Sequence, residues 1–201
     1  RTSMTLENIS PNVVNALVAT EDVRFYKHGG VDFLGLIRVA FKTILLQDRS
    51  SGGGSTISQQ LVKNLYPRQR HGVLTLPVGK IKEMIVARRI EAMYSKKKIL
   101  ELYLNTVPFG GNVFGIEAAS KRFFKKTAKN LEAEEAALLI GMLKATTYYN
   151  PRLHSERAKK RRDIVLGQMA KYEYLTPKEA EEYKAKPLKL NYTRENHNEG
   201  L

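Results

Sequence analysis

Near its N-terminus the chain carries the stretch Glu21-Asp22-Val23-Arg24-Phe25-Tyr26-Lys27-His28-Gly29. Acids, cations and aromatic rings crowd together here, and the pair Gly29-Gly30 then interrupts regular structure. Taken alone, such a mixture favours a solvated helix end with a local ion pair over the alternative, a reactive site. The segments on either side of the stretch must therefore decide between these two interpretations.

A helix is predicted just before this stretch, because Ser10 can cap it and Pro11 suits its first position. Apolar residues recur along it at helical spacing, and Glu21 stands at the end of their stripe. A carboxylate at the end of an apolar face is a candidate proton acceptor. Partial burial would favour its protonated form, whereas Arg24 and Lys27 would favour the charged form, so the residues leave the balance open.

The composition is that of a globular chain with a strong positive charge. Its 201 residues allow one large domain or two small lobes, and 34 Lys and Arg against 20 Asp and Glu give a net charge of +14. This surplus predicts an anionic partner: nucleic acid, an acidic membrane surface or a phosphate-bearing substrate. The absence of cysteine excludes disulfides and thiolate metal sites. No apolar run reaches the ~20 residues of a membrane span, and we expect an excised domain whose anchor lies elsewhere.

Residues 33–46 have apolar side chains at helical spacing, with Arg38 and Lys42 among them. The segment is too short and too basic to cross a bilayer. Two interpretations stay open: a helix in the membrane interface, with its cations at the headgroups, or an ordinary core helix with two snorkelling cations. Arg38 stands out because an arginine in an apolar helix usually faces an anion or an acid.

A polar loop at residues 47–54 ends in three glycines and leads into a predicted helix. Thr56, followed three residues later by Gln59, fits a capping box at the start of that helix. Gln60 and Lys63 are expected on the same face as these two residues. The glycine loop would leave N–H groups at the positive end of the helix dipole, which predicts an anion cradle. The glycines are not followed by Gly-Lys-Ser/Thr, so this is not a P-loop.

Residues 66–79 are predicted to form a loop that carries Arg68 and Arg70, and residues 80–91 are predicted to form a helix. On that helix Glu83 lies among apolar residues, with Lys80 as its near cation. An acid in such a position is either salt-bridged within the fold or part of a site. Glu83 is therefore the second candidate carboxylate.

Several more amphipathic helices complete a mainly α prediction, without repeats or long strands. They are expected at residues 96–105, 115–124, 130–144 with Asn130 as N-cap, 155–171, and from a capping box at Thr176 to Ala185, before an extended segment at 187–192. The cations of residues 157–162 are expected to form a solvated face.

Five segments, in order, resemble the motifs of the peptidoglycan glycosyltransferases (glycosyltransferase family 51), found in class A penicillin-binding proteins and monofunctional transglycosylases. The segments are 21–29, Gly54-Ser55-Thr56-Ile57-Ser58-Gln59-Gln60, Lys80-Ile81-Lys82-Glu83, Lys98-Ile99-Leu100-Glu101-Leu102-Tyr103-Leu104-Asn105 and Arg161-Arg162-Asp163-Ile164-Val165-Leu166. The resemblance covers about residues 10–190. It implies a glycosyltransferase domain over residues 1–192, with a jaw sub-lobe at about 33–80, and a linker at 193–201 toward a further domain.

The resemblance also implies a role for each matching residue. Glu21 corresponds to the family's catalytic glutamate and Glu83 to its second acidic residue. Substrate binding is expected from the other matching polar residues, namely Asp22, Arg24, His28, Arg38, Ser55, Thr56, Gln59, Gln60, Lys63, Arg70, Lys80 and Asn105. The third motif usually begins Arg-Lys, whereas this chain has Gly79-Lys80, and Arg68 or Arg70 is expected to supply the missing cation.

The implied fold is a lysozyme-like helical lobe with a smaller, membrane-associated jaw. The implied reaction polymerises lipid II into glycan strands at the outer face of the bacterial cytoplasmic membrane. No cofactor is required, although a divalent cation (Mg or Mn) could bridge the pyrophosphate. The expected partners are lipid II, the growing strand, the membrane surface, and a fused transpeptidase domain and N-terminal anchor outside this chain, without nucleic acid.

Two rival functions remain open at this point. A basic helical nucleic-acid binder would use residues 157–162, would show steep salt-dependent affinity and would not need the acids. A lysozyme-like hydrolase would cut glycan, but it needs no pyrophosphate cradle, so residues 56–63 argue against it.

Overall fold

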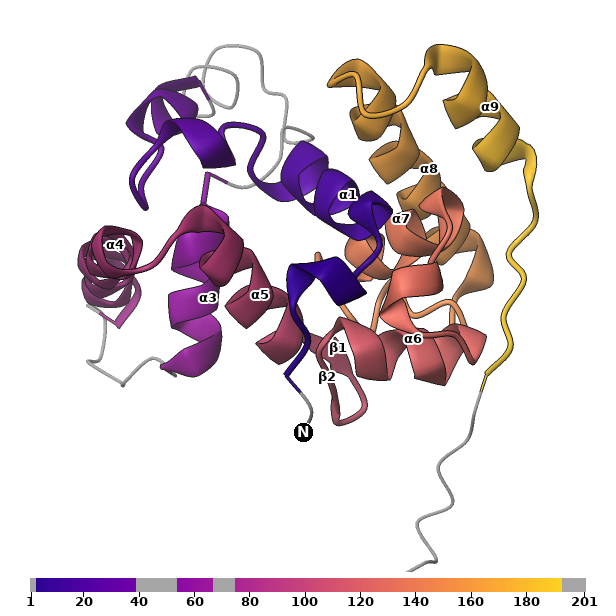
Figure 1. Ribbon diagram of the computed structural model, residues 1–201, viewed down its shortest axis with the longest axis horizontal. Helices are drawn as coiled ribbons and strands as arrows, with labels where there is room; N and C mark the ends of the chain where they lie inside the picture. Colours follow the sequence, from indigo (N-terminus) through magenta and orange to yellow (C-terminus); the bar gives the residue numbers. More distant parts are fainter. Residues whose placement is uncertain (1–2, 39–53, 67–74, 193–201) are drawn as a thin grey trace, which may run out of the picture. The chain divides into compact units, whose positions relative to one another are not determined.

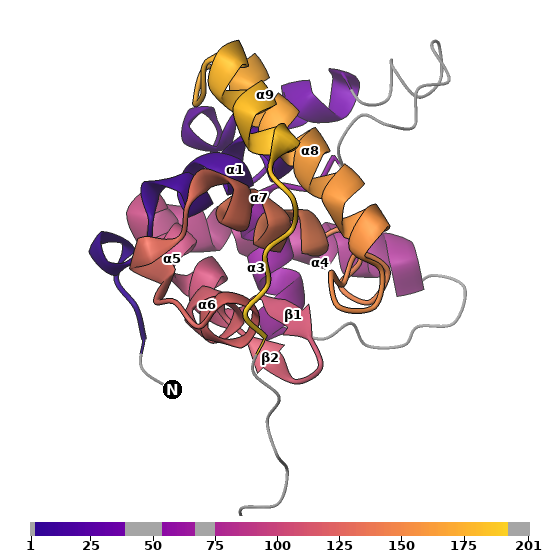
Figure 2. The same cartoon turned by 90° about the vertical axis from the view of Figure 1, so that its right-hand side faces the viewer.

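The computed structural model describes residues 3–38, 54–66 and 75–192. The chain divides into two compact units. Unit 1 comprises residues 1–16 and 108–201, and unit 2 comprises residues 17–107. Helices make up most of both units in Figures 1 and 2, and the described residues contain one two-stranded sheet. The prediction of a mainly α protein is confirmed. None of the helices in the described ranges is both long and apolar enough to cross a membrane.

Unit 2 is built on three helices in mutual contact. Helix α3 packs against both α4 and α5 (Figure 1). The elements with residues in this unit are the end of α1 (Pro11–Glu21), η2 (Phe25–Lys27), a helical turn at 33–38, α3 (Ile57–Leu65), α4 (Thr75–Met93) and α5 (Lys96–Thr106). Buried apolar side chains hold them together, among them Leu17, Phe25, Ile57, Leu61, Ala87, Ile99 and Tyr103.

The helix starts in unit 2 follow local sequence signals. Thr56 and Gln59 form the predicted capping box on α3, with the Thr56 side chain accepting from the Gln59 N–H. Ser95 caps α5 by accepting from the Lys98 N–H, and this helix ends shortly before Pro108, as predicted.

Helix α4 is longer than the sequence predicts. It begins at Thr75, inside the expected loop, and ends at Met93. Pro77 is tolerated because it lies in the first turn, where N–H groups have no intrahelical acceptor. Gly79 costs a helix only about 1 kcal/mol, which packing against α3 can offset. The predicted jaw at 33–80 falls in unit 2, but its residues 39–53 and 67–74 lie outside the described residues.

Unit 1 is a helical cluster with one hairpin. Helix α8 packs against α7 and α9, and α6 packs against α7 and β2. Its elements are η1 (Leu6–Asn8), the start of α1, β1 (Pro108–Gly110), β2 (Val113–Phe114), α6 (Ile116–Phe124), η3 (Ala128–Asn130), α7 (Ala133–Met142), α8 (Ser155–Lys171) and α9 (Pro177–Ala185). The two antiparallel strands are joined through Gly111 and Asn112, both at positive φ, a conformation favoured in tight hairpins.

The predicted caps of unit 1 are correct in two cases and wrong in one. Ser10 accepts from the Asn12 N–H, and Thr176 forms the capping box of α9 with Glu179. Asn130, the expected N-cap of α7, instead ends η3, and α7 is capped by Glu132 with Glu135 as its capping-box partner. Two glutamates three residues apart complete the same reciprocal bonds that Ser/Thr with Glu/Gln usually make.

Arginines of the fifth motif are buried, so the predicted solvated face is wrong for them. Arg162 is 1% exposed, and its guanidinium donates to the carbonyl oxygens of Lys184 and Lys186 at 2.9 and 2.8 Å. These carbonyls stand at the end of α9, where the helix lacks its own donors. Arg161 is also buried and donates to the Gly141 carbonyl. The two arginines therefore fasten helices together within unit 1.

Gly30 marks a close approach between the first motif and α4. Its φ is +92°, and a Cβ built there would lie 2.7 Å from the carbonyl carbon and oxygen of Ala87. Ala87 is fully buried. The backbone of α4 is thus pressed against the chain immediately after residues 21–29, which only glycine permits.

Gly30→Ala is expected to destabilise the protein by about 1–3 kcal/mol, because it adds backbone strain and a collision with α4. Gly29→Ala is the matched control, since a Cβ there meets nothing within 4 Å. The control should change the free energy of unfolding by less than about 1 kcal/mol. Thermal and urea denaturation of both variants measure the difference, and equal losses would contradict the close approach.

Candidate active site

Glu21 is held at the side of α3 by a chain of two hydrogen bonds. The Gln60 amide nitrogen Nε2 donates to Glu21 Oε2 at 3.0 Å, and the Tyr103 hydroxyl donates to Gln60 Oε1 at 2.9 Å. Glu21 ends α1, Gln60 lies in the first turn of α3, and Tyr103 comes from α5. Glu21 is half-buried, whereas Tyr103 is buried. The first candidate carboxylate and the second motif therefore meet directly.

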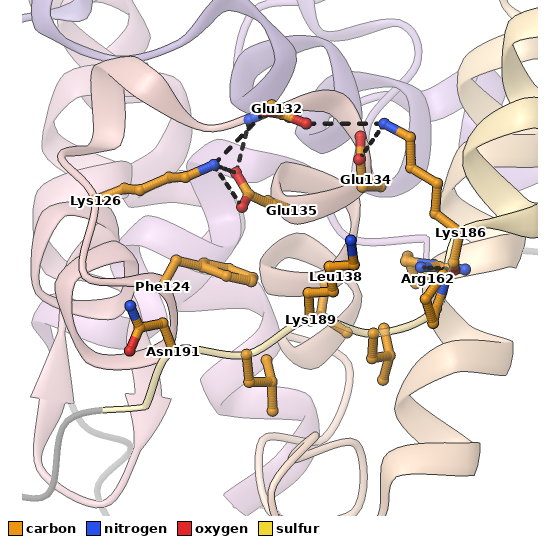
Figure 3. A pocket seen from close by; sticks show the side chains of 13 residues that line it. Phe124, Lys126, Glu132, Glu134, Glu135, Leu138, Arg162, Lys186, Lys189 and Asn191 are labelled. Carbon is orange, nitrogen blue, oxygen red and sulfur yellow. Dashed lines mark hydrogen bonds and ion pairs between the residues drawn. The ribbon is translucent and has the colours of Figure 1, made fainter.

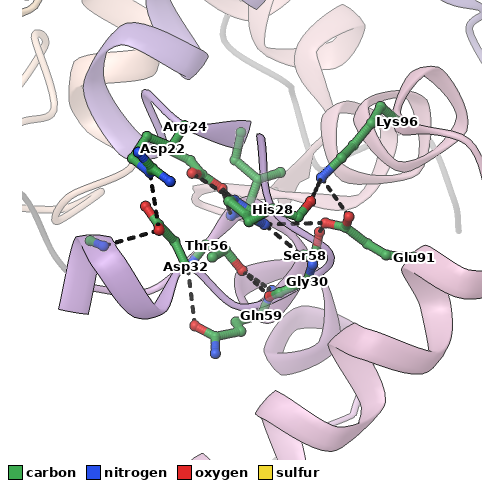
Figure 4. A network of polar contacts seen from close by, with 12 residues as sticks. Asp22, Arg24, His28, Gly30, Asp32, Thr56, Ser58, Gln59, Glu91 and Lys96 are labelled. Atoms are coloured by element: carbon green, nitrogen blue, oxygen red, sulfur yellow. Dashed lines mark hydrogen bonds and ion pairs between the residues drawn. The ribbon is translucent and has the colours of Figure 1, made fainter. Parts of the chain in front are cut away.

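Asp22 is the centre of the polar network in Figure 4. Its Oδ2 accepts from the backbone N–H of Ile57 at 3.0 Å, and both of its oxygens lie 3.0 Å from His28 Nε2. The Gly30 N–H donates to His28 Nδ1 at 3.2 Å. Because Nδ1 accepts a hydrogen bond, Nε2 carries the proton and donates to Asp22. Asp22 thus ties the first motif to the start of α3.

The start of α3 uses its own N–H groups within the chain. The N–H groups of Thr56, Ile57 and Gln59 donate to Gln59 Oε1, Asp22 Oδ2 and Thr56 Oγ1, at 3.1, 3.0 and 3.2 Å. The expectation that such groups form a cradle for a bound anion is wrong for these three donors. The negative charge that favours a helix N-terminus is supplied here by the Asp22 carboxylate.

Lys80 brings the third motif to the second. Its Nζ donates to Ser55 Oγ at 2.7 Å and to Gln59 Oε1 at 3.3 Å. The predicted pair with Glu83 is present, with Nζ 3.9 Å from Oε2. Glu83 is buried, as its place on the inner stripe of α4 predicts. Thr56 reaches the residue that follows the first motif, because its hydroxyl donates to the Gly30 carbonyl at 2.7 Å.

Glu91 joins four segments of unit 2 at one buried carboxylate. It is an acceptor for the Ser58 hydroxyl of α3, and it forms an ion pair with Lys96 at the start of α5 (Figure 4). Its Oε1 lies 3.9 Å from His28 Nδ1. Lys96 also donates to the His28 carbonyl at 2.6 Å and lies 4.3 Å from the centre of the Phe25 ring. The Glu91 side chain is only 4% exposed.

Arg24 is placed by an acid that follows the glycine pair. Its Nε lies 3.2 Å from Asp32 Oδ1, which also accepts from the Gly35 N–H at 3.0 Å. Asp32 therefore caps the helical turn at 33–38 while it holds Arg24.

The remaining predicted site residues are less closely connected. Lys63 and Arg38 are exposed, on α3 and at the end of the turn at 33–38. The Asn105 amide donates to the Glu101 carbonyl one turn back at 2.7 Å. Arg70, like Arg68, lies outside the described residues, so the replacement for the third-motif arginine stays a prediction.

Sequence reasoning missed Glu91, Asp32 and Tyr103 as members of this network. A signal existed for each. Glu91 follows Glu83 by eight residues on the inner stripe of α4, and Asp32 precedes an apolar run, as N-caps do. For Tyr103 the signal is its place in the fourth motif. In the structure, burial together with the nearby Glu21 carboxylate raises the pKa of its phenol.

A groove of about 510 Å³ lies in unit 1, and none of the predicted site residues lines it. Figure 3 shows the side chains that line it, among them Lys126, Glu132, Glu135, Leu138 and Lys186. Lys126 lies 2.8 Å from Glu135, and this hydrogen bond raises the pKa of the lysine. Two of the cations that line the groove, Lys126 and Lys186, thus already have carboxylate partners in Glu135 and Glu134. The described residues contain no group of three or more His, Asp or Glu able to hold a metal ion.

Asp22→Asn is expected to destabilise the protein by about 1–3 kcal/mol. The carboxylate serves two N–H donors, and an amide in its place must turn its NH₂ toward one of them. Glu181→Gln is the control, because Glu181 is 74% exposed in its pair with Lys184 and should contribute no more than about 1 kcal/mol. Urea denaturation measures both variants; equal stability of Asp22→Asn and wild type would contradict the anchoring role.

Comparison with known proteins identifies the chain's family. The family model "Transglycosylase" matches residues 1–170. The chain is 44% identical over 186 residues to penicillin-binding protein 1A of Aquifex aeolicus, 38% over 192 to that of Escherichia coli, and 39% over 195 to penicillin-binding protein 1F of Bacillus subtilis. These matches cover 92%, 96% and 97% of the chain but 25%, 22% and 27% of the relatives.

A crystal structure of penicillin-binding protein 1A from Haemophilus influenzae has a similar fold, with a TM-score of 0.56 at 20% identity over 96% of this chain and 18% of that one. The chain thus spans about a quarter of the length of the curated relatives. The predicted enzyme class, a peptidoglycan transglycosylase of the kind found in penicillin-binding proteins, is confirmed by the family match. This chain belongs to the transglycosylase family.

Proposed function

We propose that the chain polymerises lipid II into peptidoglycan glycan strands, with Glu21 as the base. The observation that carries this proposal is the hydrogen bond from Gln60 to Glu21, which sets a half-buried carboxylate beside the second motif. The family match supports glycosyl transfer as the reaction class. The acceptor and the leaving group are taken from the resemblance of the five motifs.

Glu21 is proposed to take the proton from the 4-hydroxyl of the acceptor sugar. A sugar hydroxyl is a weak nucleophile, and a positioned carboxylate accelerates such a step by typically 10²- to 10⁴-fold. The bond from Gln60 supports this role because it fixes the position of the carboxylate.

The leaving group is proposed to be a lipid pyrophosphate, whose negative charge grows in the transition state. Cations held close to it stabilise that charge. Lys63 and Arg38 are exposed cations of unit 2, and Lys80 of the same unit is held by Ser55 and Gln59. Glu83, paired with Lys80, is proposed to orient this lysine and not to transfer protons.

The reaction is proposed to be one direct displacement that inverts an α-linked donor into a β-linkage, without a covalent intermediate. The new C1–O bond forms as the bond from C1 to the pyrophosphate oxygen breaks, and the hydroxyl proton goes to Glu21. We propose that no resident cofactor is required, and that Mg²⁺ or Mn²⁺, where present, binds the pyrophosphate of the substrate.

The substrate is proposed to be reached at the outer face of the bacterial cytoplasmic membrane. Of the two interpretations of residues 33–46, exposure supports an interfacial one for the described part, because Phe33, Leu34 and Ile37 are all exposed. Other large apolar side chains of unit 2 are exposed as well, namely Leu65, Tyr66, Leu76, Ile81 and Ile85. A fused transpeptidase domain and an N-terminal anchor are proposed for the rest of the protein, in keeping with the greater length of its relatives.

The rival functions have less support. A nucleic-acid binder would need the cations of residues 157–162 at the surface, but Arg161 and Arg162 are buried. A hydrolase would need a second acid to activate water, and Glu83 is paired with Lys80.

Glu21→Gln is expected to lower the rate of strand formation from labelled lipid II by about 10²- to 10⁴-fold, because the amide cannot accept the proton. Gel separation of the products measures the strands. Glu182→Gln on α9, where the side chain is 62% exposed, should keep the wild-type rate. An unchanged melting temperature shows that the fold is intact. Strand formation by Glu21→Gln at the wild-type rate would remove the base assignment.

Lys63→Ala is expected to lower turnover by about 10²-fold, because a cation facing the departing pyrophosphate is lost. Lys63→Arg should retain part of the activity. Lys160→Ala removes an exposed cation from unit 1 and is the matched control. The initial rate of lipid II consumption measures all three variants, and an unchanged rate for Lys63→Ala would show that the leaving group does not meet this lysine.

A further inference from the structure

The Gln60 amide between Glu21 and Tyr103 can take only one orientation. An ionised carboxylate accepts hydrogen bonds and donates none, so the amide must turn its NH₂ toward Glu21. Its oxygen Oε1 then faces Tyr103 and accepts from the hydroxyl. With the amide reversed, two oxygens would face each other across a contact of 3.0 Å at Glu21.

Tyr103 is suited to hold the amide in this orientation. Its side chain is fully buried, at 1% exposure, so the hydroxyl has no competition from bulk water. Burial and the nearby Glu21 carboxylate both raise the pKa of the phenol, which keeps its proton available for donation. Tyr103 lies on α5, which packs directly against α3, so the donating hydroxyl is held by a rigid helix.

We propose that Tyr103 is a positioning residue for the base: through Gln60 it directs a hydrogen-bond donor at Glu21. This inference rests on the proposed function for its effect on rate, since it concerns the carboxylate assigned as base. In general, a hydrogen-bond donor aimed at a carboxylate oxygen stabilises the ionised form and fixes the orientation of the carboxylate. Loss of the hydroxyl leaves Gln60 Oε1, on a half-buried side chain, without this donor and lets the amide rotate.

Tyr103→Phe is the decisive variant, because it removes one hydroxyl and keeps the buried ring. The acid limb of the pH–rate profile for strand formation is expected to move to higher pH by about one unit, which is a tenfold lower rate on that limb. The rate should recover as the pH rises and Glu21 becomes charged again. Tyr192→Phe is the matched control, since its hydroxyl accepts from Arg122 Nε at 2.9 Å in unit 1. Its profile should match that of wild type.

Gln60→Ala breaks the same chain at its middle and supplies a second test that does not depend on the folding of Tyr103→Phe. It should displace the acid limb in the same direction. In the double variant Tyr103→Phe/Gln60→Ala the displacement should equal that of Gln60→Ala alone, because the tyrosine acts only through the amide. A merely structural tyrosine would instead lower the rate equally at all pH values, and that result would overturn the proposal.

A readout without substrate separates this inference from the proposed function. The ¹³Cδ resonance of Glu21, followed by NMR across pH, is expected to titrate at higher pH in Tyr103→Phe than in wild type. If Glu21 titrates at higher pH in Tyr103→Phe but the wild-type protein makes no strands from lipid II, the positioning role is supported and lipid II polymerisation is rejected. An unchanged titration midpoint in both Tyr103→Phe and Gln60→Ala would overturn the positioning role, whatever the activity.

Discussion

The structure of unit 2 depends on one carboxylate at the start of a helix. Asp22 accepts from the first N–H of α3 and from His28, so it fixes the end of α1 against α3. Glu21 precedes Asp22 in the chain, and Gln60 follows Ile57 by three residues on α3, about one helical turn. Anchoring Asp22 on Ile57 therefore brings Glu21 to Gln60. The hydrogen bond from Ile57 to Asp22, which joins the end of α1 to α3, is thus adjacent to the hydrogen bond from Gln60 to Glu21, the proposed base.

Around this carboxylate each buried charge has its own partner. Glu91 is matched by Lys96 and Ser58, Asp32 by Arg24, and Glu83 by Lys80. Buried ion pairs contribute little net stability, because desolvation offsets their attraction, but breaking one leaves an uncompensated charge. Such a network allows few alternative arrangements of the segments that it joins. Gly30 lies directly against the backbone of α4 at Ala87 and Arg88, so the chain after the first motif and this helix approach each other closely.

Local patterns in the sequence predicted much of this structure. Capping boxes at Thr56 and Thr176 and the stripe that pairs Lys80 with Glu83 all lie within a few residues, and all are present. The hydrogen bond from Ile57 to Asp22 could not be predicted in the same way, because the two residues are 35 positions apart and no local sequence pattern connects them. The sequence therefore suggested that the N–H groups at the start of α3 are free to bind an anion, whereas in the structure the Asp22 carboxylate occupies that position.

The buried arginines show the same limit. Arg161 and Arg162 stand in a run of cations, which predicts a solvated face. Their acceptors are carbonyls on other segments, such as Lys184 and Gly141, and only the fold brings these together. The start of α4 was missed for a related reason, because Pro77 and Gly79 signal a loop unless packing compensates for them.

The central claim is that Glu21, held by the second motif, acts as base in a single displacement. The anomeric configuration of the linkages made by the wild-type protein from lipid II, read by NMR of the purified strands, tests it most directly. Every new linkage is expected to be β, the inverse of the α-linked donor. New α linkages would mean net retention at C1, which one direct displacement with Glu21 as base cannot give, and would contradict the central claim.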